Sequence, residues 1–264
     1  MSLLFAALLG IVQGLTEFLP VSSSGHLVMA EAMLGIDPPG VAFEVLLHLA
    51  TLCAVVWAYR ARVGELAAGL VRVDREAWRY TGLILLASVP AGVVGVLGRS
   101  ELEAAFGQPV LAAAMLLVTG CVVFTLKFTG PRASDPTPDV PRSLWIGIAQ
   151  AFAILPGISR SGSTVAVGAW RGLEVEKLAE FSFLLSIPAI LGASLLQLGD
   201  MRDAAAIGAG PLAVGFVFAL AAGVLAIRLF VRMLRNRTFH HFAWYCWAAG
   251  TAYLLAAAFV PALR

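Results

Sequence analysis

The sequence contains little charge. Only 13% of its 264 residues are Asp, Glu, Lys or Arg, whereas 60% are apolar. Soluble domains average about 25% charged and 45 to 50% apolar residues. Together with a mean hydropathy of +0.89, this composition predicts a membrane protein. The 18 basic and 16 acidic residues nearly balance, which gives no reason to expect nucleic acid as a partner.

Cysteine is also scarce. The three cysteines each stand alone in an apolar stretch, and an odd number of isolated cysteines excludes a secreted disulfide framework. The first 16 residues carry no charge, but they lack the basic region and the small-residue cleavage pattern of a signal peptide. A removable signal peptide is therefore not expected.

Long stretches without charged side chains predict the membrane helices. A spanning helix needs about 20 mostly apolar residues, and six stretches are long enough or nearly so. The predicted spans cover residues 41–59, 81–98, 109–128, 179–198, 209–231 and 241–260.

Two further apolar regions, residues 1–34 and 143–172, have polar centres that contain Pro, Gly and Ser. Proline beside serine and glycine interrupts a helix, and non-helical backbone at membrane depth is tolerated only inside protein or beside water. Each region is predicted to form a re-entrant pair of short helices. The two centres resemble each other. When they are aligned with a gap of one residue, three features occupy matching positions: Leu-Pro, a pair of serines, and Ser-Gly.

This similarity predicts an inverted repeat. A re-entrant pair returns to its starting face and three spans follow it, so the second pair must enter from the opposite face. The expected fold is an all-α integral membrane protein, with six transmembrane helices plus two re-entrant helix pairs in an inverted repeat. Residues 1–264 form a single membrane domain, with repeats in 1–128 and 143–264 and a connecting cytoplasmic loop in 129–142. Such repeats usually place a polar site near the midplane.

The basic residues are divided unequally between the two predicted faces. Three of them, Arg99, Arg202 and Arg264, lie on one face and 14 on the other, with Arg160 left in the second polar centre. Lys and Arg are enriched in cytoplasmic loops, so the second face is predicted to be cytoplasmic and both termini extracytoplasmic. The 14 residues are Arg60, Arg62, Arg72, Arg75, Arg79, Lys127, Arg132, Arg142, Arg171, Lys177, Arg228, Arg232, Arg235 and Arg237.

The first polar centre carries side chains suited to hydrolysis. They are Glu17, Ser22, Ser23, Ser24 and His26. A hydroxyl, a carboxylate and an imidazole can activate one another in nucleophilic or general-base catalysis. Gln13 lies one helical turn before Glu17, so the two side chains share a face and could hold a hard divalent cation.

The second polar centre surrounds an arginine with small residues. Arg160 lies among Ser159, Ser161, Gly162, Ser163 and Thr164. A guanidinium beside hydroxyl groups and accessible glycine backbone is suited to binding phosphate. Because Arg160 has no acidic neighbour in the sequence, an anionic ligand is expected to supply its partner.

Less specific interpretations stay open for several of these residues. Serine and threonine in membrane helices often bond only to their own backbone. For Ser22 and Ser24 this alternative has the same weight as a functional role. Glu44 and His48 lie four residues apart at the outer end of a predicted span. They are expected to pair with each other and are not assigned to the site, and a supporting role beside the site stays open as the alternative.

The two motifs together resemble the bacitracin-resistance type of undecaprenyl-diphosphate phosphatase. They read Gln-x-x-x-Glu-Phe-Leu-Pro-Val-Ser-Ser-Ser-Gly-His from residue 13 and Pro-Gly-Ile-Ser-Arg-Ser-Gly-Ser-Thr from residue 156. The chain length and the stretches at residues 43–45 and 180–185 also resemble this family. Position 13 is Gln where many members have Glu, which weakens its assignment as a charged cation ligand.

The resemblance implies a multi-pass enzyme of the bacterial plasma membrane. Its implied reaction is hydrolysis of a polyprenyl diphosphate lipid to the monophosphate, which recycles the carrier lipid for cell-wall synthesis and confers bacitracin resistance. The implied cofactor is a divalent cation, Mg²⁺ or Ca²⁺. The polar centres and the resemblance predict catalytic roles for Glu17, Ser23, His26 and Arg160, substrate binding by Ser22, Ser24, Ser159, Ser161, Gly162 and Thr164, and cation binding by Glu17 and Gln13.

In the predicted mechanism, Ser23 attacks the terminal phosphorus, Arg160 holds the phosphate oxygens, and Glu17 with His26 transfers protons. Direct attack by water stays open as an alternative. A transporter or flippase for a phosphorylated polyprenyl lipid is the alternative function, because broken helices in inverted repeats are also a transporter architecture. The substrate is expected to enter a cavity open to the extracytoplasmic side, and the sequence does not determine the oligomeric state.

Overall fold

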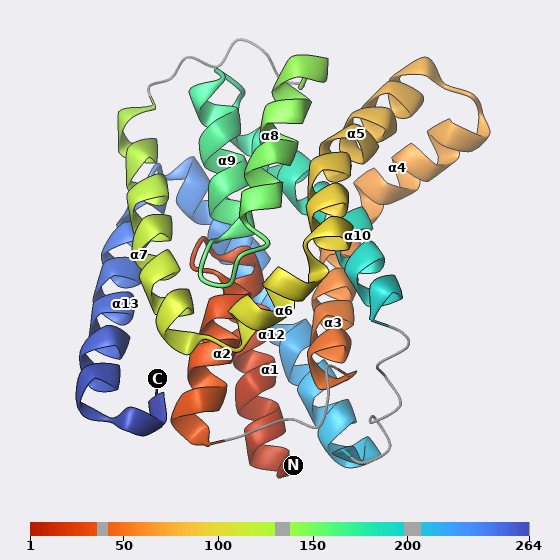
Figure 1. Cartoon of the computed structure of the whole chain (residues 1–264). Helices are drawn as coiled ribbons and strands as arrows, with labels where there is room; N and C mark the ends of the chain where they lie inside the picture. The colour runs from red at the N-terminus through yellow and green to blue at the C-terminus, as the bar shows by residue number, and fades with distance from the viewer. Residues whose placement is uncertain (36–41, 130–137, 198–206, 264) are drawn as a thin grey trace.

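The computed structural model describes residues 1–35, 42–129, 138–197 and 207–263, and the regular elements in these ranges are helices (Figure 1). This confirms the prediction of an all-α membrane protein. The elements are α1 (Leu3–Phe18), α2 (Ser23–Leu34), α3 (Ala42–Ala58), α4 (Arg60–Val71), α5 (Arg75–Leu97), α6 (Arg99–Phe106), α7 (Pro109–Phe124), η1 (Thr125–Phe128), α8 (Val140–Phe152), α9 (Arg160–Trp170), α10 (Val175–Leu196), α12 (Ala209–Arg235), η3 (Phe239–His241), α13 (Phe242–Phe259) and η4 (Pro261–Leu263).

Each predicted span corresponds to an observed helix. Five helices among the described residues are long and apolar enough to cross a membrane, and α3 joined to α4 makes a sixth candidate that bends by 81°. The predicted spans 41–59, 81–98, 109–128, 179–198, 209–231 and 241–260 correspond to α3, α5, α7 with η1, α10, α12 and α13. Residues 41, 198, most of the predicted loop 129–142, and Arg132, Arg202 and Arg264 lie outside the described residues.

Two helices begin earlier than the charge pattern predicts, because aspartates cap them. The Asp74 carboxylate accepts hydrogen bonds from the backbone N–H groups of Glu76 and Ala77, so α5 starts at Arg75. Asp139 accepts from the N–H of Arg142 at 2.9 Å, so α8 starts inside the predicted loop. Aspartate at the N-cap satisfies N–H groups that have no partner within the helix.

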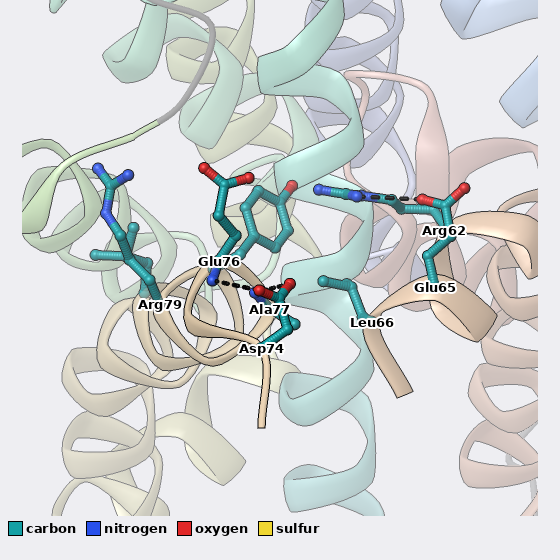
Figure 2. Close-up of a pocket in the computed structure, with 9 residues that line it drawn as sticks. Arg62, Glu65, Leu66, Asp74, Glu76, Ala77 and Arg79 are labelled. Carbon is teal, nitrogen blue, oxygen red and sulfur yellow. Dashed lines mark hydrogen bonds and ion pairs between the residues drawn. The ribbon is translucent and has the colours of Figure 1, made fainter. Parts of the chain in front are cut away.

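Helix α4 was not predicted and extends beyond the bundle beside the first turns of α5 (Figure 1). Its Ala, Leu, Glu and Arg residues are strong helix formers. Arg62 holds it in place by donating to Glu65 at 3.2 Å and to Glu180 of α10 at 3.0 Å. Figure 2 shows Arg62 and Glu65 facing the Asp74 cap across a pocket of mixed charge. That pocket contains none of the predicted site residues.

The two predicted helix pairs form and lie in opposite halves of the bundle. In Figure 1, α1 and α2 occupy the half that carries both chain termini, whereas α8 and α9 occupy the other half. The turn of each pair points toward the middle, where the backbone N–H of Gly157 donates to Ser22 Oγ at 3.1 Å. The two polar centres therefore meet inside the protein.

Glycines bring α1 close to α12. A side chain at Gly10 or Gly14 would collide with backbone atoms of Gly215 or Ala219. Small residues four apart allow membrane helices to approach closely. This contact fixes the axis of α1, and with it the position of Glu17 in the last turn of that helix.

Candidate active site

The turns that precede α2 and α9 are capped in the same way. Ser22 precedes α2 and its Oγ accepts from the N–H of Gly25 at 3.3 Å. Ser159 precedes α9 and its Oγ accepts from the N–H of Gly162 at 3.1 Å. The serine and Ser-Gly positions that coincide in the two motifs thus make equivalent capping bonds. This matching supports the predicted repeat at the two turns, and the repeat over the whole halves stays a prediction.

Direct hydrogen bonds join the two turns. In addition to the Gly157 contact with Ser22, the Ser161 hydroxyl donates to the carbonyl oxygen of Leu19 at 3.2 Å. Gly157 has a φ of +94°, and a Cβ there would collide with the carbonyl oxygen of Ala112. Only glycine fits this combination of backbone angle and close contact.

Thr119 of α7 anchors the second turn and was not predicted. Its hydroxyl donates to the carbonyl of Gly157 at 2.7 Å and accepts from the N–H of Ser159 at 2.9 Å. The side chain is buried. In the sequence it is a single threonine within an apolar span, and such residues usually bond only to their own helix.

Glu17 is the centre of the site. Its Oε1 accepts from Arg160 Nη2 at 2.8 Å, and its Oε2 accepts from Ser23 Oγ at 2.6 Å. Gln13 Nε2 also donates to Oε2, at 3.1 Å. Only 6% of the Glu17 side chain and 14% of the Arg160 side chain are exposed. The expectation that an anionic ligand supplies the partner of Arg160 is therefore wrong for this structure, because Glu17, 143 residues away in the sequence, pairs with it.

The carbonyl of Ser182 and the hydroxyl of Thr164 help to orient Arg160. The Ser182 carbonyl accepts from Arg160 Nη1 at 3.2 Å. Thr164 donates to the Arg160 carbonyl at 2.8 Å, and the two hydroxyls of Thr164 and Ser182 lie 2.7 Å apart. Thr164, predicted to bind phosphate, is fully buried and bonds to protein groups. Ser182 was not predicted as a site residue, although it lies in the stretch 180–185 that resembles the family.

His26 faces away from Glu17. Its Nδ1 lies 2.8 Å from the carbonyl oxygen of Ser22, and its Nε2 lies 2.9 Å from the hydroxyl of Tyr245 on α13. Because a carbonyl oxygen can only accept, Nδ1 carries the proton and Nε2 accepts from Tyr245. Both ring nitrogens of neutral His26 are therefore occupied by groups outside the predicted catalytic set.

His48 of α3 approaches Glu17 instead. Its Nδ1 donates to the backbone carbonyl of Glu44 at 2.8 Å, which leaves Nε2 directed toward Glu17 Oε2 at 3.8 Å. The expected pairing of His48 with Glu44 thus involves the backbone of Glu44. The spacing of these two residues was the sequence signal that could have pointed to this second histidine.

A cavity of roughly 220 Å³ opens above these groups. Six predicted residues line it: Glu17, Ser22, Ser23, Ser24, Ser159 and Arg160. Its other walls include Glu44, His48, Phe106 of α6 and apolar residues of α10. The predicted residues Gln13, His26, Ser161, Gly162 and Thr164 do not line the cavity.

The cavity is lined by the first turns of α3 and the last turns of α10. In Figure 1 these turns lie toward the end of the bundle that carries both chain termini. The basic residues at the ends of α4, α9 and α12 lie toward the opposite end. The active groups are thus reached from the end of the molecule with few basic side chains.

Comparison with known proteins gives a consistent result. A family model described as bacitracin resistance protein BacA matches residues 6–252. A relative from Methanobrevibacter smithii named undecaprenyl-diphosphatase is 40% identical over 95% of this chain and 96% of its own length. Relatives with the same name from Syntrophotalea carbinolica (41% identical, 95% and 97% covered) and Bacteroides thetaiotaomicron (38% identical, 97% and 99% covered) are similarly close.

Proposed function

The chain belongs to the family of bacitracin resistance proteins, and we propose that it removes the terminal phosphate of undecaprenyl diphosphate to regenerate the monophosphate carrier lipid. One observation carries this proposal: the Glu17 carboxylate binds the Ser23 hydroxyl and the Arg160 guanidinium beside a single cavity. A nucleophile, a base and an anion-binding group are then within reach of one phosphate. Catalysis of phosphoryl transfer depends mainly on positioning such groups and on neutralising charge.

In the proposed first step, Ser23 Oγ attacks the terminal phosphorus. Its proton passes to Glu17 Oε2, to which it already donates at 2.6 Å. The bond between the terminal phosphorus and the bridging oxygen breaks, and undecaprenyl monophosphate leaves with that oxygen. Water then releases inorganic phosphate from Ser23, and the hydroxyl regains a proton. A water molecule activated by Glu17 is the alternative nucleophile, and trapping of phosphoserine distinguishes the two routes.

Arg160 exchanges partners when substrate binds. In the structure its Nη2 donates to Glu17 and its Nη1 to the Ser182 carbonyl. A phosphate that enters the cavity supplies oxygens that match the planar guanidinium, whose fork favours bidentate contacts. This exchange removes the positive charge of Arg160 from Glu17 Oε1, and the carboxylate becomes a stronger base for the Ser23 proton at Oε2.

The two histidines have different proposed roles. His48 lines the cavity 3.8 Å from Glu17 Oε2 and relays protons between that carboxylate and the cavity. His26 acts as a positioning residue, because its bond to the Ser22 carbonyl fixes the turn that presents Ser23. This assignment moves the proton-transfer role predicted for His26 to His48.

We propose that a divalent cation, Mg²⁺ or Ca²⁺, binds in the cavity together with the substrate phosphates, because the described residues contain no group of three or more His, Cys, Asp or Glu side chains that could hold a metal ion. Glu17 and Glu44 both line it, and Mg²⁺ is typically bound by one or two carboxylates together with substrate phosphates. These two residues would hold the cation, which supplies neutralisation of the diphosphate charge when bound. Gln13 presents its amide nitrogen to Glu17, and its Oε1 is buried without a partner among the described residues.

Phosphate release from undecaprenyl diphosphate by the purified protein tests the proposal. Arg160→Ala is expected to abolish release, and Arg160→Lys to restore little, because a point charge cannot reproduce the guanidinium fork. Arg72→Ala, on an exposed turn outside the cavity, is the control and should behave as wild type. Wild-type protein that releases no phosphate with divalent cation present would favour the transporter alternative.

A further inference from the structure

A second, larger hollow lies on the basic end of the bundle. It is a groove of roughly 490 Å³ between the end of α3 and the last turns of α12. Its lining residues are Trp57, Ala58, Tyr59, Arg60, Val224, Ile227, Arg228, Val231, Arg232, Arg235 and Asn236. None of these residues lines the catalytic cavity.

The groove is strongly cationic. Of the residues that the structure describes, four arginines line it and no acidic residue does. Within the described residues, Arg228 and Arg232 form no ion pair, whereas Arg235 makes an exposed contact with Glu176 at 3.5 Å, the kind of pair that contributes little to stability. Arg60 is the first residue of α4, where the helix dipole adds further positive charge. An anion in the groove would reduce this repulsion.

The positive charge at this groove exceeds what the helix end alone requires. Cations in the last turn of a helix stabilise its negative end, and Arg232 and Arg235 serve α12 in this way. Arg228 lies before the last turn, and Arg60 lies at a helix N-terminus. Neither position is explained by the dipole of its own helix.

The groove also combines an apolar wall with its positive charge, as a lipid site requires. Val224, Ile227 and Val231 form its apolar wall on α12. Val224 lies about 6 Å deeper along the helix than Arg228, at 1.5 Å per residue. Trp57 and Tyr59, aromatic residues of the kind enriched at membrane interfaces, also line the groove. The Arg60 guanidinium lies over the Trp57 ring, 5.2 Å from its centroid.

We propose that this groove binds an anionic phospholipid of the surrounding leaflet. The phosphate lies between Arg60, Arg228 and Arg232, and an acyl chain runs along the valines and isoleucine of α12. Basic pockets between membrane helices are suited to such headgroups. This inference does not depend on the proposed phosphatase activity, because it rests on a separate set of residues.

Lipid titration of the purified full chain tests the inference. The protein in neutral detergent at 0.15 M salt is titrated with phosphatidylglycerol or phosphatidylcholine, and bound lipids are counted by native mass spectrometry. Wild type is expected to bind phosphatidylglycerol preferentially. One arginine near the membrane surface raises the affinity for anionic lipid by about fivefold. The double variant Arg228→Gln with Arg232→Gln loses two such contributions, so its affinity should be about 30-fold lower.

A matched control separates the groove from general surface charge. Arg72→Gln with Arg75→Gln removes two exposed arginines from the same end of the molecule, outside the groove. It should leave phosphatidylglycerol affinity within about threefold of wild type, because exposed distant charges are screened at this salt concentration. Equal losses in both double variants, or no loss in the groove variant, would overturn the proposal.

A third variant tests the apolar wall with all the arginines present. Val231→Trp fills the groove, and it should weaken phosphatidylglycerol binding while phosphate release stays at the wild-type rate. Undecaprenyl monophosphate provides the last comparison. The concentration of undecaprenyl monophosphate that displaces bound phosphatidylglycerol is compared with the concentration at which phosphatidylglycerol binds. If the first concentration is lower, the groove is a carrier-lipid site and the proposal is wrong.

Discussion

Replacing Glu17 with Gln is expected to separate catalysis from anion binding. The two carboxylate oxygens accept hydrogen bonds from Ser23, Arg160 and Gln13. A glutamine has one acceptor oxygen and one NH₂ group, so in either orientation its NH₂ opposes at least one of these donors. The variant keeps the shape of the side chain and loses both the base and the negative charge.

The expected magnitudes follow from these contacts. Loss of a positioned base lowers kcat by at least about 100-fold. Loss of one partner from a buried ion pair costs about 3 to 5 kcal/mol of stability, because Arg160 remains charged. A phosphate about 5 Å from Glu17 is repelled by about 3 kcal/mol at an effective dielectric constant of about 20. The affinity for phosphate, measured without a divalent cation, should therefore rise by more than about 100-fold in the variant.

Two assays measure these effects. Phosphate release gives kcat, and the shift of the thermal unfolding midpoint with inorganic phosphate gives anion affinity in the presence of a chelator. Glu103→Gln is the control, since Glu103 forms an exposed pair with Arg99, and it should change stability by less than about 1 kcal/mol. A Glu17→Gln variant with kcat within about threefold of wild type, or with weakened phosphate binding, would refute this reasoning.

Three further predictions concern the turns and the access route. Thr119→Val removes two buried hydrogen bonds and should lower the free energy of unfolding by about 1 to 3 kcal/mol per unpaired group. The loss is measured as a lower unfolding midpoint. Ser88→Ala, which loses only a bond to its own helix, is the control. Gly157→Ala should abolish phosphate release because the added Cβ has no room. Gly172 also has a positive φ, but open space surrounds it. The control variant Gly172→Ala should therefore cost only about 1 kcal/mol of strain. Ser24→Cys in a variant without native cysteines should react with an impermeant thiol reagent added outside intact cells; reaction only from the inner face would reverse the predicted orientation.

The sequence predicts the helical framework well because the membrane constrains it strongly. Apolar length identifies the spans, and the Pro, Ser and Gly residues identify the two turns. The serine pattern also predicts equivalent caps, since Ser22 and Ser159 make the same local bond in each turn. These features depend on residues a few positions apart, so local physical chemistry suffices to predict them.

The side-chain geometry of the site is less predictable because it depends on packing between distant segments. Nothing near Arg160 in the sequence indicates Glu17 as its partner, and Thr119 has no local signature. The position of His26 directly after the serines predicts a catalytic role, but its ring contacts Tyr245 of α13. His48 approaches Glu17 only because α3 packs beside α1.

The interlocking of the two halves has a consequence for biosynthesis. The most extensive helix contacts, α1 with α12, α7 with α13, α3 with α12 and α5 with α8, each join the first half to the second. Arg160 is translated 143 residues after Glu17, a delay of roughly 7 to 30 s at ribosomal rates of about 5 to 20 residues per second. During this interval the nascent amino-terminal half lacks both its packing partners and its counter-charge. Glu17 therefore reaches the membrane before Arg160 has been synthesised, and insertion of the second half completes the fold and the active site together.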